Sequence, residues 1–354
     1  MIAIPSLPDV ITSCVYARDK GANGIQVCQR PMFGTGNKML IIKVLAAGIN
    51  PVDYKLPSII PFMQSKGVGI DVCGEVAYAP AGCPFQAGQT VFGYSASGGL
   101  SEYCECEPGK VALKPESLSA VQCAMMPVAG ITSLQALRDK GNVQPGDSVL
   151  IIGASGGCGV MGVSIAKALG ATVTGVCSGK NREFVQSLGA DTVHCYDGED
   201  GKLPLSTQFD CIFDTVTSSD DFNYEPLGRP LLKSAVSGSK RSSMYVAING
   251  GVGDWIRLLL GQALYLGDAL QRRGYKLLVT NQNSADLAAL GDICTKHSLP
   301  FHLDEFSANE RPLLTSQLNV DAAFTRLKSR RTKGKIILTA SEDVWAQHFR
   351  TCGN

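Results

Sequence analysis

A run of small residues at Gly153–Gly159, Gly-Ala-Ser-Gly-Gly-Cys-Gly, has the composition and spacing that phosphate binding requires. The run follows Ser148–Ile152, an apolar and partly β-branched stretch that predicts a buried strand. It precedes Val160–Leu169, whose apolar spacing predicts a helix. A strand, a glycine-rich turn and a helix in this order bring backbone amides to a pyrophosphate, so the stretch predicts a dinucleotide site.

Within the turn, Ala154, Gly156 and Gly159 occupy the three glycine places of the G-x-G-x-x-G pattern. Small residues there let the backbone approach the phosphates, and Gly159 lets the helix pack closely on the strand. The alternative is a tight turn without a ligand, which is common for glycine patterns taken alone. Because a strand and a helix flank the turn, we favour the nucleotide site and predict these cofactor-binding residues: Ser155, Gly156, Gly157 and Cys158.

The end of the next predicted strand, Ala171–Cys177, indicates which nucleotide is bound. Sites for NAD usually carry an acidic residue there for the ribose 2′-hydroxyl. This chain instead carries Ser178, Lys180 and Arg182, and it has no acid before Glu183. Hydroxyl and cationic donors suit a 2′-phosphate, so these three residues predict NADPH rather than NADH as the cofactor. The alternative is that the two cations are solvated charges at the start of the following helix.

The whole chain, 354 residues with 45% hydrophobic and 18% charged residues, has the composition of an ordinary globular protein. Its formal charge of +1 gives no argument for a nucleic-acid partner or for an acidic membrane surface. The 13 cysteines are scattered and no secretory signal precedes them, so we expect reduced thiols and a cytoplasmic protein, with an organelle as the alternative. The most apolar segment, Trp255–Leu266, is too short to span a bilayer, so we expect no integral membrane segment.

Two changes of pattern divide the chain. Up to about residue 125 strands alternate with turn residues, and no helical period is sustained before about Ala120. From there to about Thr280 predicted helices and strands alternate, which is typical of a doubly wound parallel sheet. In the tail we expect a helix at Ser284–Lys296, a short strand at His302–Glu305 and a closing strand at Lys335–Thr339. The predicted fold class is therefore α/β, with a largely antiparallel β domain and a parallel one.

Several short stretches resemble the zinc-independent medium-chain dehydrogenases/reductases of the quinone oxidoreductase type. Besides the glycine turn, they are Gly48–Lys55, Gly69–Val76, Gly98–Tyr103, Met126–Ser133, Ser187–Asp191 and Lys333–Leu338. The stretch Cys177–Asp191 is similar in particular to chloroplast-envelope quinone oxidoreductase homologues and to alkenal or enone reductases. The resemblance covers roughly residues 11 to 340.

The resemblance implies a GroES-like catalytic domain at residues 1–125 and 283–354, and a Rossmann NADP-binding domain at residues 126–282. Zinc-dependent relatives carry a cysteine near Pro51–Asp53 and a His-Glu pair near Ile70 and Asp71; this chain has neither, so we expect no metal site. Without zinc, reduction of a simple carbonyl is not favoured. We expect hydride transfer from NADPH to a quinone or an α,β-unsaturated carbonyl, with the protein mainly positioning the reactants.

Two residues are candidates for the catalytic contacts. Asn50 follows an apolar strand and precedes Pro51, so its amide is a candidate for stabilising an enolate-like oxygen. The alternative for Asn50 is a cap of an Asx-Pro turn. Tyr54 is a candidate donor to the substrate oxygen, and its alternative is a half-buried aromatic residue without a catalytic role.

Three further residues are predicted to contact the cofactor. The resemblance places Thr132 near the nicotinamide end, although the residue could instead cap a helix starting there. It also matches Tyr196 to a tyrosine beside the adenosine 2′-phosphate. Asn249 follows the predicted strand Met244–Ile248, at the carboxyl edge of the sheet where a ligand is expected.

Two other functions stay open at this point. One is reduction of enoyl thioesters, which some relatives perform. The other is a nucleotide-binding structural or regulatory protein with little turnover. The predicted partner is a small-molecule quinone or enone, with a second copy of the chain in a homodimer as an option.

Overall fold

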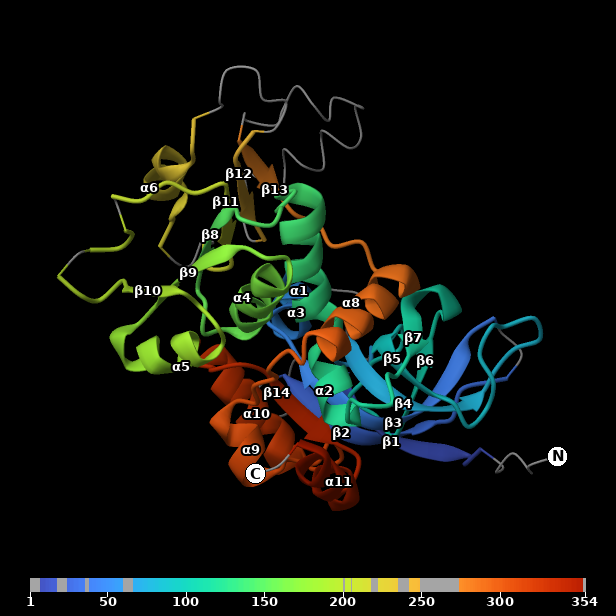
Figure 1. Cartoon of the computed structure of the whole chain (residues 1–354). Coiled ribbons are helices and arrows are strands. Elements are labelled where there is room, and N and C mark those ends of the chain that lie inside the picture. Colours follow the sequence, from blue (N-terminus) through green and yellow to red (C-terminus); the bar gives the residue numbers. More distant parts are fainter. Residues whose placement is uncertain are drawn as a thin grey trace. The chain divides into compact units, whose positions relative to one another are not determined.

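The computed structural model describes residues 7–17, 24–35, 38–59, 66–199, 201–204, 206–217, 222–234, 242–248 and 274–352 (Figure 1). The chain divides into two compact units. The first comprises Met1–Ile131 together with Gln282–Asn354, and the second comprises Thr132–Asn281. The family resemblance implies a catalytic role for residues 1–125 and 283–354 and NADP binding for residues 126–282. A division into compact units does not test these roles, so the functional domains stay a prediction.

The second unit is built on a six-stranded parallel sheet with the strand order β10-β9-β8-β11-β12-β13. The chain runs outward from β8 to β10 and then continues on the other side of β8, as in doubly wound dinucleotide-binding sheets. This order confirms the predicted parallel sheet and puts a switch point between β8 and β11. The strands are β8 (Ser148–Ile152), β9 (Thr172–Cys177), β10 (Thr192–Cys195), β11 (Cys211–Asp214), β12 (Met244–Ala247) and β13 (Tyr275–Leu277).

Helices connect and cover these strands. The helix α4 (Gly157–Ala168) leads from β8 to β9 and packs against both (Figure 1). Four of the five residues of β8 are buried, as expected for a parallel strand covered on both faces. The other helical segments near or in this unit are α3 (Pro127–Leu134), the π-helix η3 (Gln135–Lys140), η4 (Gly179–Asn181), α5 (Arg182–Ser187), α6 (Glu225–Gly228) and η5 (Arg229–Leu231).

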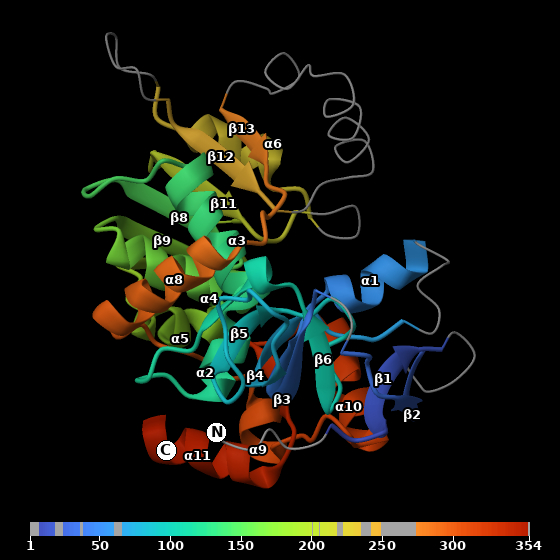
Figure 2. The ribbon, with the colours of Figure 1, turned by 90° about the vertical axis from the view of Figure 1, so that its right-hand side faces the viewer.

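The first unit is built on antiparallel strands. Its sheet has the order β14-β3-β4-β5-β7, and β6 pairs with the part of β3 that β14 leaves open. A separate ribbon of β1 and β2 lies beside α10 (Figure 2), where Gln317 hydrogen-bonds to Ile25 and Val27. The strands are β1 (Val10–Tyr16), β2 (Ile25–Pro31), β3 (Leu40–Ile49), β4 (Asp71–Tyr78), β5 (Thr90–Tyr94), β6 (Tyr103–Cys106), β7 (Val111–Leu113) and β14 (Ile336–Thr339).

Two details of the first unit differ from the sequence-based expectation. A helix, α1 (Val52–Ile59), lies in the stretch where no helical period is sustained, because eight residues are too few to establish one. The predicted strand at His302–Glu305 is wrong: only Leu303 forms a bridge, to Lys335. Asp304 instead caps α9 by accepting from Phe306 N. The helices and turns are α1, η2 (Pro108–Lys110), α2 (Ala120–Met125), α8 (Ser284–Lys296), α9 (Glu305–Glu310), α10 (Gln317–Lys328) and α11 (Glu342–Cys352).

The tail of the chain contributes to the core of the first unit. Phe324 of α10 and Leu338 of β14 are buried in the same apolar cluster as Ile42 and Val72. The antiparallel pairing of β14 with β3 sets Ile336 opposite Ile49. Continuing this register by one residue brings Lys335 next to Asn50, from a position 285 residues away in the chain.

Candidate active site and cofactor site

A buried polar cluster lies at the end of β3 in the first unit. Lys335 Nζ donates to Asn50 Oδ1 at 2.6 Å, to Asp71 Oδ2 at 3.0 Å and to the carbonyl oxygen of Ile49 at 3.3 Å. Lys335, Asn50 and Asp71 are 5%, 4% and 0% exposed. Buried charges are stable only when they are paired and hydrogen-bonded, and this cluster meets both conditions.

The side-chain amide of Asn50 is held from both ends. Its oxygen accepts from Lys335, and its Nδ2 donates to Asp71 Oδ2 at 2.9 Å. An amide nitrogen has two hydrogens, so the Asp71 bond leaves Nδ2 a second donor. The predicted polar contact of Asn50 with a substrate would therefore have to come from that N–H, while its carbonyl is committed to Lys335. The predicted role of Asn50 stays a prediction.

Asp71 also anchors the start of α3. Its Oδ1 accepts from the backbone amide of Val128 at 2.8 Å, and Tyr94 Oη donates to the carbonyl of Pro127 at 2.9 Å. Gly48 stands opposite Asp71 in the β3–β4 register, and a Cβ on Gly48 would lie 3.2 Å from the Asp71 side chain. The missing side chain at Gly48 therefore makes room for the carboxylate and for the Ala124 carbonyl oxygen, which would lie 2.7 Å from such a Cβ.

Asp53 is the second carboxyl of this region, and it is 1% exposed. Its Oδ2 accepts from the backbone amide of Asn50 at 2.7 Å, and its backbone carbonyl accepts from Tyr16 Oη at 2.6 Å. Burial raises the pKa of Asp53 to about 7, although the hydrogen bond from Asn50 acts against this; nearby Asp71 raises the pKa further and Lys335 lowers it. Asp53 can therefore exchange a proton near neutral pH.

Tyr54, the other predicted catalytic residue, lies on α1 and packs partly buried against the apolar cluster of the first unit. Lys328 Nζ lies 5.6 Å from the centroid of its ring. Its hydrogen-donor role stays a prediction.

The glycine turn of the second unit has the geometry of a phosphate cradle. Gly153 has φ of +80°, and a Cβ on Gly159 would lie 2.1 Å from the Gly153 carbonyl oxygen. Both positions therefore require glycine. At Gly156, the N-cap of α4, the nearest atom to such a Cβ is 3.5 Å away. The space beside Gly156 and the first-turn amides of α4, which a helix leaves without intrahelical partners, fit a dinucleotide pyrophosphate.

The loop after β9 lies against this turn. Asn181 Nδ2 donates to Ser155 Oγ at 3.0 Å, and the Asn181 amide donates to the carbonyl of Ser178. The Gly179 amide donates to Asp197 Oδ1 at 2.8 Å. An acid is thus present near this loop, but it comes from the end of β10 and its carboxylate binds a backbone amide.

The cations predicted to bind a 2′-phosphate are differently placed. Lys180 is exposed in η4. Arg182 begins α5 and donates from Nη1 to the carbonyl of Val193 at 3.1 Å. Tyr196 is 37% exposed, and the ammonium of Lys202 lies 5.3 Å from its ring centroid. Lys202 is not among the cations considered from the sequence, because no short motif contains it.

In the second unit, the part of α3 that contains Thr132 lies next to the glycine turn that contains Cys158. Thr132 sits inside α3, which begins at Pro127, so the idea that Thr132 caps a helix is wrong. Its hydroxyl hydrogen-bonds to that of Thr280 at 3.0 Å. The carbonyl of Cys158 accepts from Ser133 Oγ at 2.8 Å, which ties α3 to the glycine turn.

The remaining predictions concern residues that the structure describes only in part. Asn249 and the segment Trp255–Leu266 lie outside the described residues. In the described ranges, no three His, Cys, Asp or Glu side chains gather in a way that could hold a metal ion. The same part of the chain contains no helix long and apolar enough to cross a membrane.

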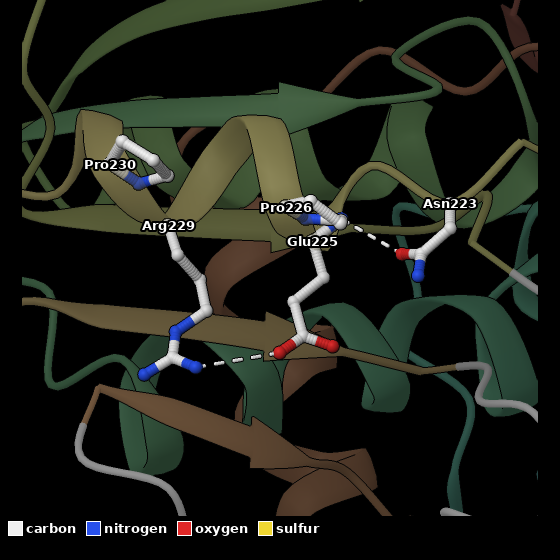
Figure 3. A pocket seen from close by; sticks show the side chains of 5 residues that line it. All are labelled: Asn223, Glu225, Pro226, Arg229 and Pro230. Atoms are coloured by element: carbon white, nitrogen blue, oxygen red, sulfur yellow. Dashed lines mark hydrogen bonds and ion pairs between the residues drawn. The ribbon is translucent and has the colours of Figure 1, made fainter.

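A wide surface hollow of about 560 Å³ lies on the second unit beside α6 and η5 (Figure 3). Its charged side chains are already paired, since Arg229 Nη1 lies 3.5 Å from Glu225 Oε1. The Glu225 amide donates to Asn223 Oδ1 at 3.0 Å. Because these lining residues bind one another, the hollow gives no indication of a ligand.

Lys335, Asp71 and Asp53 are the main residues that sequence reasoning missed. A signal existed for two of them: Asp71 and Lys335 are charged residues at the border of apolar strand sequences, Asp-Val-Cys-Gly and Lys-Ile-Ile-Leu. Charges in such places usually have partners. The sequence alone did not indicate that the two are partners of each other.

Comparisons with known proteins agree with this architecture. A chloroplast envelope quinone oxidoreductase homolog from Arabidopsis thaliana is 33% identical over 58% of this chain and 68% of its own length. A trans-enoyl reductase from Aspergillus terreus is 29% identical over 87% of this chain and 88% of its own. No model of a protein family matches the chain.

Solved structures show the same fold. A quinone oxidoreductase from Coxiella burnetii superposes with a TM-score of 0.74 at 24% identity, covering 94% of this chain and 100% of its own. A mycobacterial protein solved in complex with NADPH superposes with a TM-score of 0.68 at 20% identity, covering 93% and 99%. A GroES-like β unit and a Rossmann unit define a medium-chain dehydrogenase/reductase. Within that class the chain belongs to the quinone oxidoreductase family and is an oxidoreductase.

Proposed function

We propose that the protein reduces quinones or α,β-unsaturated carbonyl compounds with NADPH and without a metal ion. The observation that carries the proposal is the glycine turn at the end of β8. Gly153 and Gly159 are sterically required there, while the side of Gly156 is open for a phosphate. The membership in the quinone oxidoreductase family supports the reaction class.

The second unit supports a nicotinamide dinucleotide as the cofactor. Ser155, Gly156, Gly157 and the amide of Cys158 would hold its pyrophosphate at the first turn of α4, and Ser178 would face its ribose. For NADPH in particular, Lys180, Arg182 and Lys202 supply positive charge around the loop after β9 and beside Tyr196. We also propose Thr132 as a cofactor contact on the family resemblance, and Asn249 because it follows the predicted strand Met244–Ile248 at the carboxyl edge of the sheet.

In the first unit, the chain's own residues would orient the substrate and stabilise the charge that develops on it. When bound, the reduced nicotinamide supplies the hydride. Lys335 and Asp71 fix the amide of Asn50, whose remaining N–H would stabilise negative charge developing on a substrate oxygen. Such preorganised donors act on conjugated carbonyls, in which the hydride adds to carbon and charge moves to oxygen. Tyr54 would contact the substrate from α1.

The test is consumption of NADPH by the purified protein, followed by the loss of nicotinamide absorbance, with quinones, alkenals, enones and enoyl thioesters as acceptors. Turnover with enones or quinones is the expected result. Tight NADPH binding without turnover of any acceptor would favour a structural or regulatory role. A parallel series with NADH tests the choice of cofactor.

A second candidate function is reduction of enoyl thioesters. The similarity to a trans-enoyl reductase over 87% of this chain favours it. The same panel separates the two: an enoyl thioester preferred over simple enones at equal concentration would support this candidate. A homodimer, and a cytoplasmic or organellar location, stay predictions from the sequence.

A further inference from the structure

A small cavity of about 170 Å³ lies within the first unit, and it carries polar groups that the proposed function does not use. It is lined by Tyr16, Asp53, Ser95 and Ala96, and by the backbone around three glycines: Gly67, Gly69 and Gly98. Pockets that hold drug-sized ligands have volumes of about 300–1,000 Å³. This cavity is therefore large enough for the polar end of a substrate and not for a whole ligand.

Two polar atoms of the lining residues have unmet hydrogen-bonding capacity. Within the described part of the chain, neither Asp53 Oδ1 nor Ser95 Oγ has a hydrogen-bond partner, although both atoms are buried. A buried polar atom without a partner costs free energy, so a ligand that satisfies it is favoured there. The carboxyl group of Asp53 is held in place by its other oxygen, Oδ2, which accepts from the backbone amide of Asn50.

The cavity wall is built by close backbone contact. A Cβ on Gly67 would lie 1.8 Å from the Ser97 carbonyl oxygen, and one on Gly98 would lie 2.4 Å from the carbonyl carbon of Gly67. Tyr16 Oη, at the end of β1, donates to the Asp53 carbonyl on α1 and so holds that residue in place. The lining is therefore positioned by packing before any ligand arrives.

The polar groups of this lining favour a ligand atom that accepts hydrogen bonds. Burial raises the pKa of Asp53 to about 7, so near neutral pH much of the group is a neutral acid. The charged and titratable groups that face it are Asp71, Lys335 and Tyr16. With Oδ2 accepting from Asn50, the proton of the neutral form belongs on Oδ1. A carbonyl oxygen accepts from such an acid and from a serine hydroxyl at the same time.

We propose that this cavity receives the carbonyl oxygen of the substrate and that Asp53 is its proton donor, with Ser95 as the second hydrogen-bond donor. The inference rests on the proposed function and refines it: the carbonyl oxygen receives its hydrogen bonds from Asp53 and Ser95, which line the cavity, in place of Asn50, which does not. The β-carbon of the enone gains the hydride from the reduced nicotinamide, and the electron pair of the C=C bond moves to form an enolate. The O–H bond of Asp53 breaks and an O–H bond to the enolate oxygen forms. The resulting enol tautomerises to the saturated ketone, and the Asp53 carboxylate regains its proton from water.

The kinetic test compares Asp53→Asn with the wild type and with Asp343→Asn, a matched change at an exposed position on α11. We expect Asp53→Asn to lower kcat about 100-fold, within the range typical of a lost general acid. Because the pKa of Asp53 is raised to about 7, we expect the wild-type rate to fall as pH rises through this value. The variant loses this dependence, and Asp343→Asn keeps both the rate and the profile. An Asp53→Asn enzyme with an unchanged rate and pH profile would overturn the proposal.

Ser95→Ala keeps the test decisive if Asp53→Asn does not fold. Loss of one hydrogen bond to the bound carbonyl predicts an increase in KM for the enone of about threefold to tenfold. A KM equal to that of the wild type counts against the cavity as the carbonyl site.

A binding measurement separates this inference from the proposed function. A small saturated ketone with a carbon-13-labelled carbonyl is bound to the protein and its C=O stretch is recorded by infrared spectroscopy. We expect the stretch to shift to lower frequency well below pH 7 and to return well above it, in the wild type and not in Asp53→Asn. Lack of binding, or a shift independent of pH and of Asp53, refutes the inference. Lack of turnover with every acceptor refutes the proposed function instead.

Discussion

The two candidate sites of this protein are built in opposite ways. The glycine turn of the second unit consists of seven consecutive residues, Gly153–Gly159, and offers backbone amides. The polar cluster of the first unit joins the buried side chains of Asn50, Asp71 and Lys335, which are distant in sequence. A local backbone site depends on sterics, whereas an assembled side-chain site depends on charge balance. Substitutions in the two regions should therefore fail in different ways.

The largest expected effect is at the charge pair of the first unit. Lys335→Met leaves Asp71 buried without its cation, so the free energy of unfolding should fall by about 3–5 kcal/mol. Denaturation by urea measures this. Lys110→Met is the matched control, because Lys110 forms an exposed pair with Glu107 and should change stability by less than about 1 kcal/mol. Equal effects of the two variants would remove the contrast between a buried and an exposed pair.

Asp53 should make stability depend on pH in an unusual direction. Its pKa is raised from 3.8 to about 7 in the folded protein, so between these values the folded state binds more protons than the unfolded state. The contribution of Asp53 to the free energy of unfolding therefore falls as pH rises through this window, by roughly 4 kcal/mol in total.

The measurement is urea denaturation of the wild type and of Asp53→Asn across that pH window. The difference in unfolding free energy between the two should change steadily with pH. A constant difference would mean that Asp53 titrates normally.

The glycine turn should separate folding from binding. Gly159→Ala places a Cβ 2.1 Å from the Gly153 carbonyl oxygen, so it should destabilise the second unit by about 1–3 kcal/mol. Gly156→Ala meets no atom closer than 3.5 Å, so it should leave the melting temperature nearly unchanged. It should nevertheless weaken NADPH binding about tenfold or more, because the backbone can no longer approach the phosphate. Differential scanning fluorimetry and fluorescence titration with NADPH distinguish the two outcomes.

The smallest effect concerns the 2′-phosphate. Lys180→Ala should weaken NADPH binding by about threefold to tenfold, as expected for one partly solvated charge contact, and leave NADH binding unchanged. Lys167→Ala is the matched control, because Lys167 is paired with Asp191 on the same unit. Equal loss of NADPH and NADH affinity in Lys180→Ala would place the residue away from the phosphate.

The two regions differ in how much of them could be predicted from the sequence, and the reason is physical. The turn at Gly153–Gly159 and its flanking strand and helix were predictable because each depends on residues next to one another. For Thr132, its place in α3 was mispredicted because Pro127 starts that helix five residues earlier. For His302–Glu305, Asp304 forms side-chain bonds to Phe306 N and Arg326 that compete with strand pairing.

The sequence by itself determined the doubly wound parallel sheet, the antiparallel β unit and the glycine turn, because periodicity and local sterics encode them. Only the tertiary structure decided that Lys335 pairs with Asn50 and Asp71, and that Asp53 lies buried beside a cavity. These facts depend on the register of β14 against β3 and on the exclusion of water, which residues far apart in the chain create together.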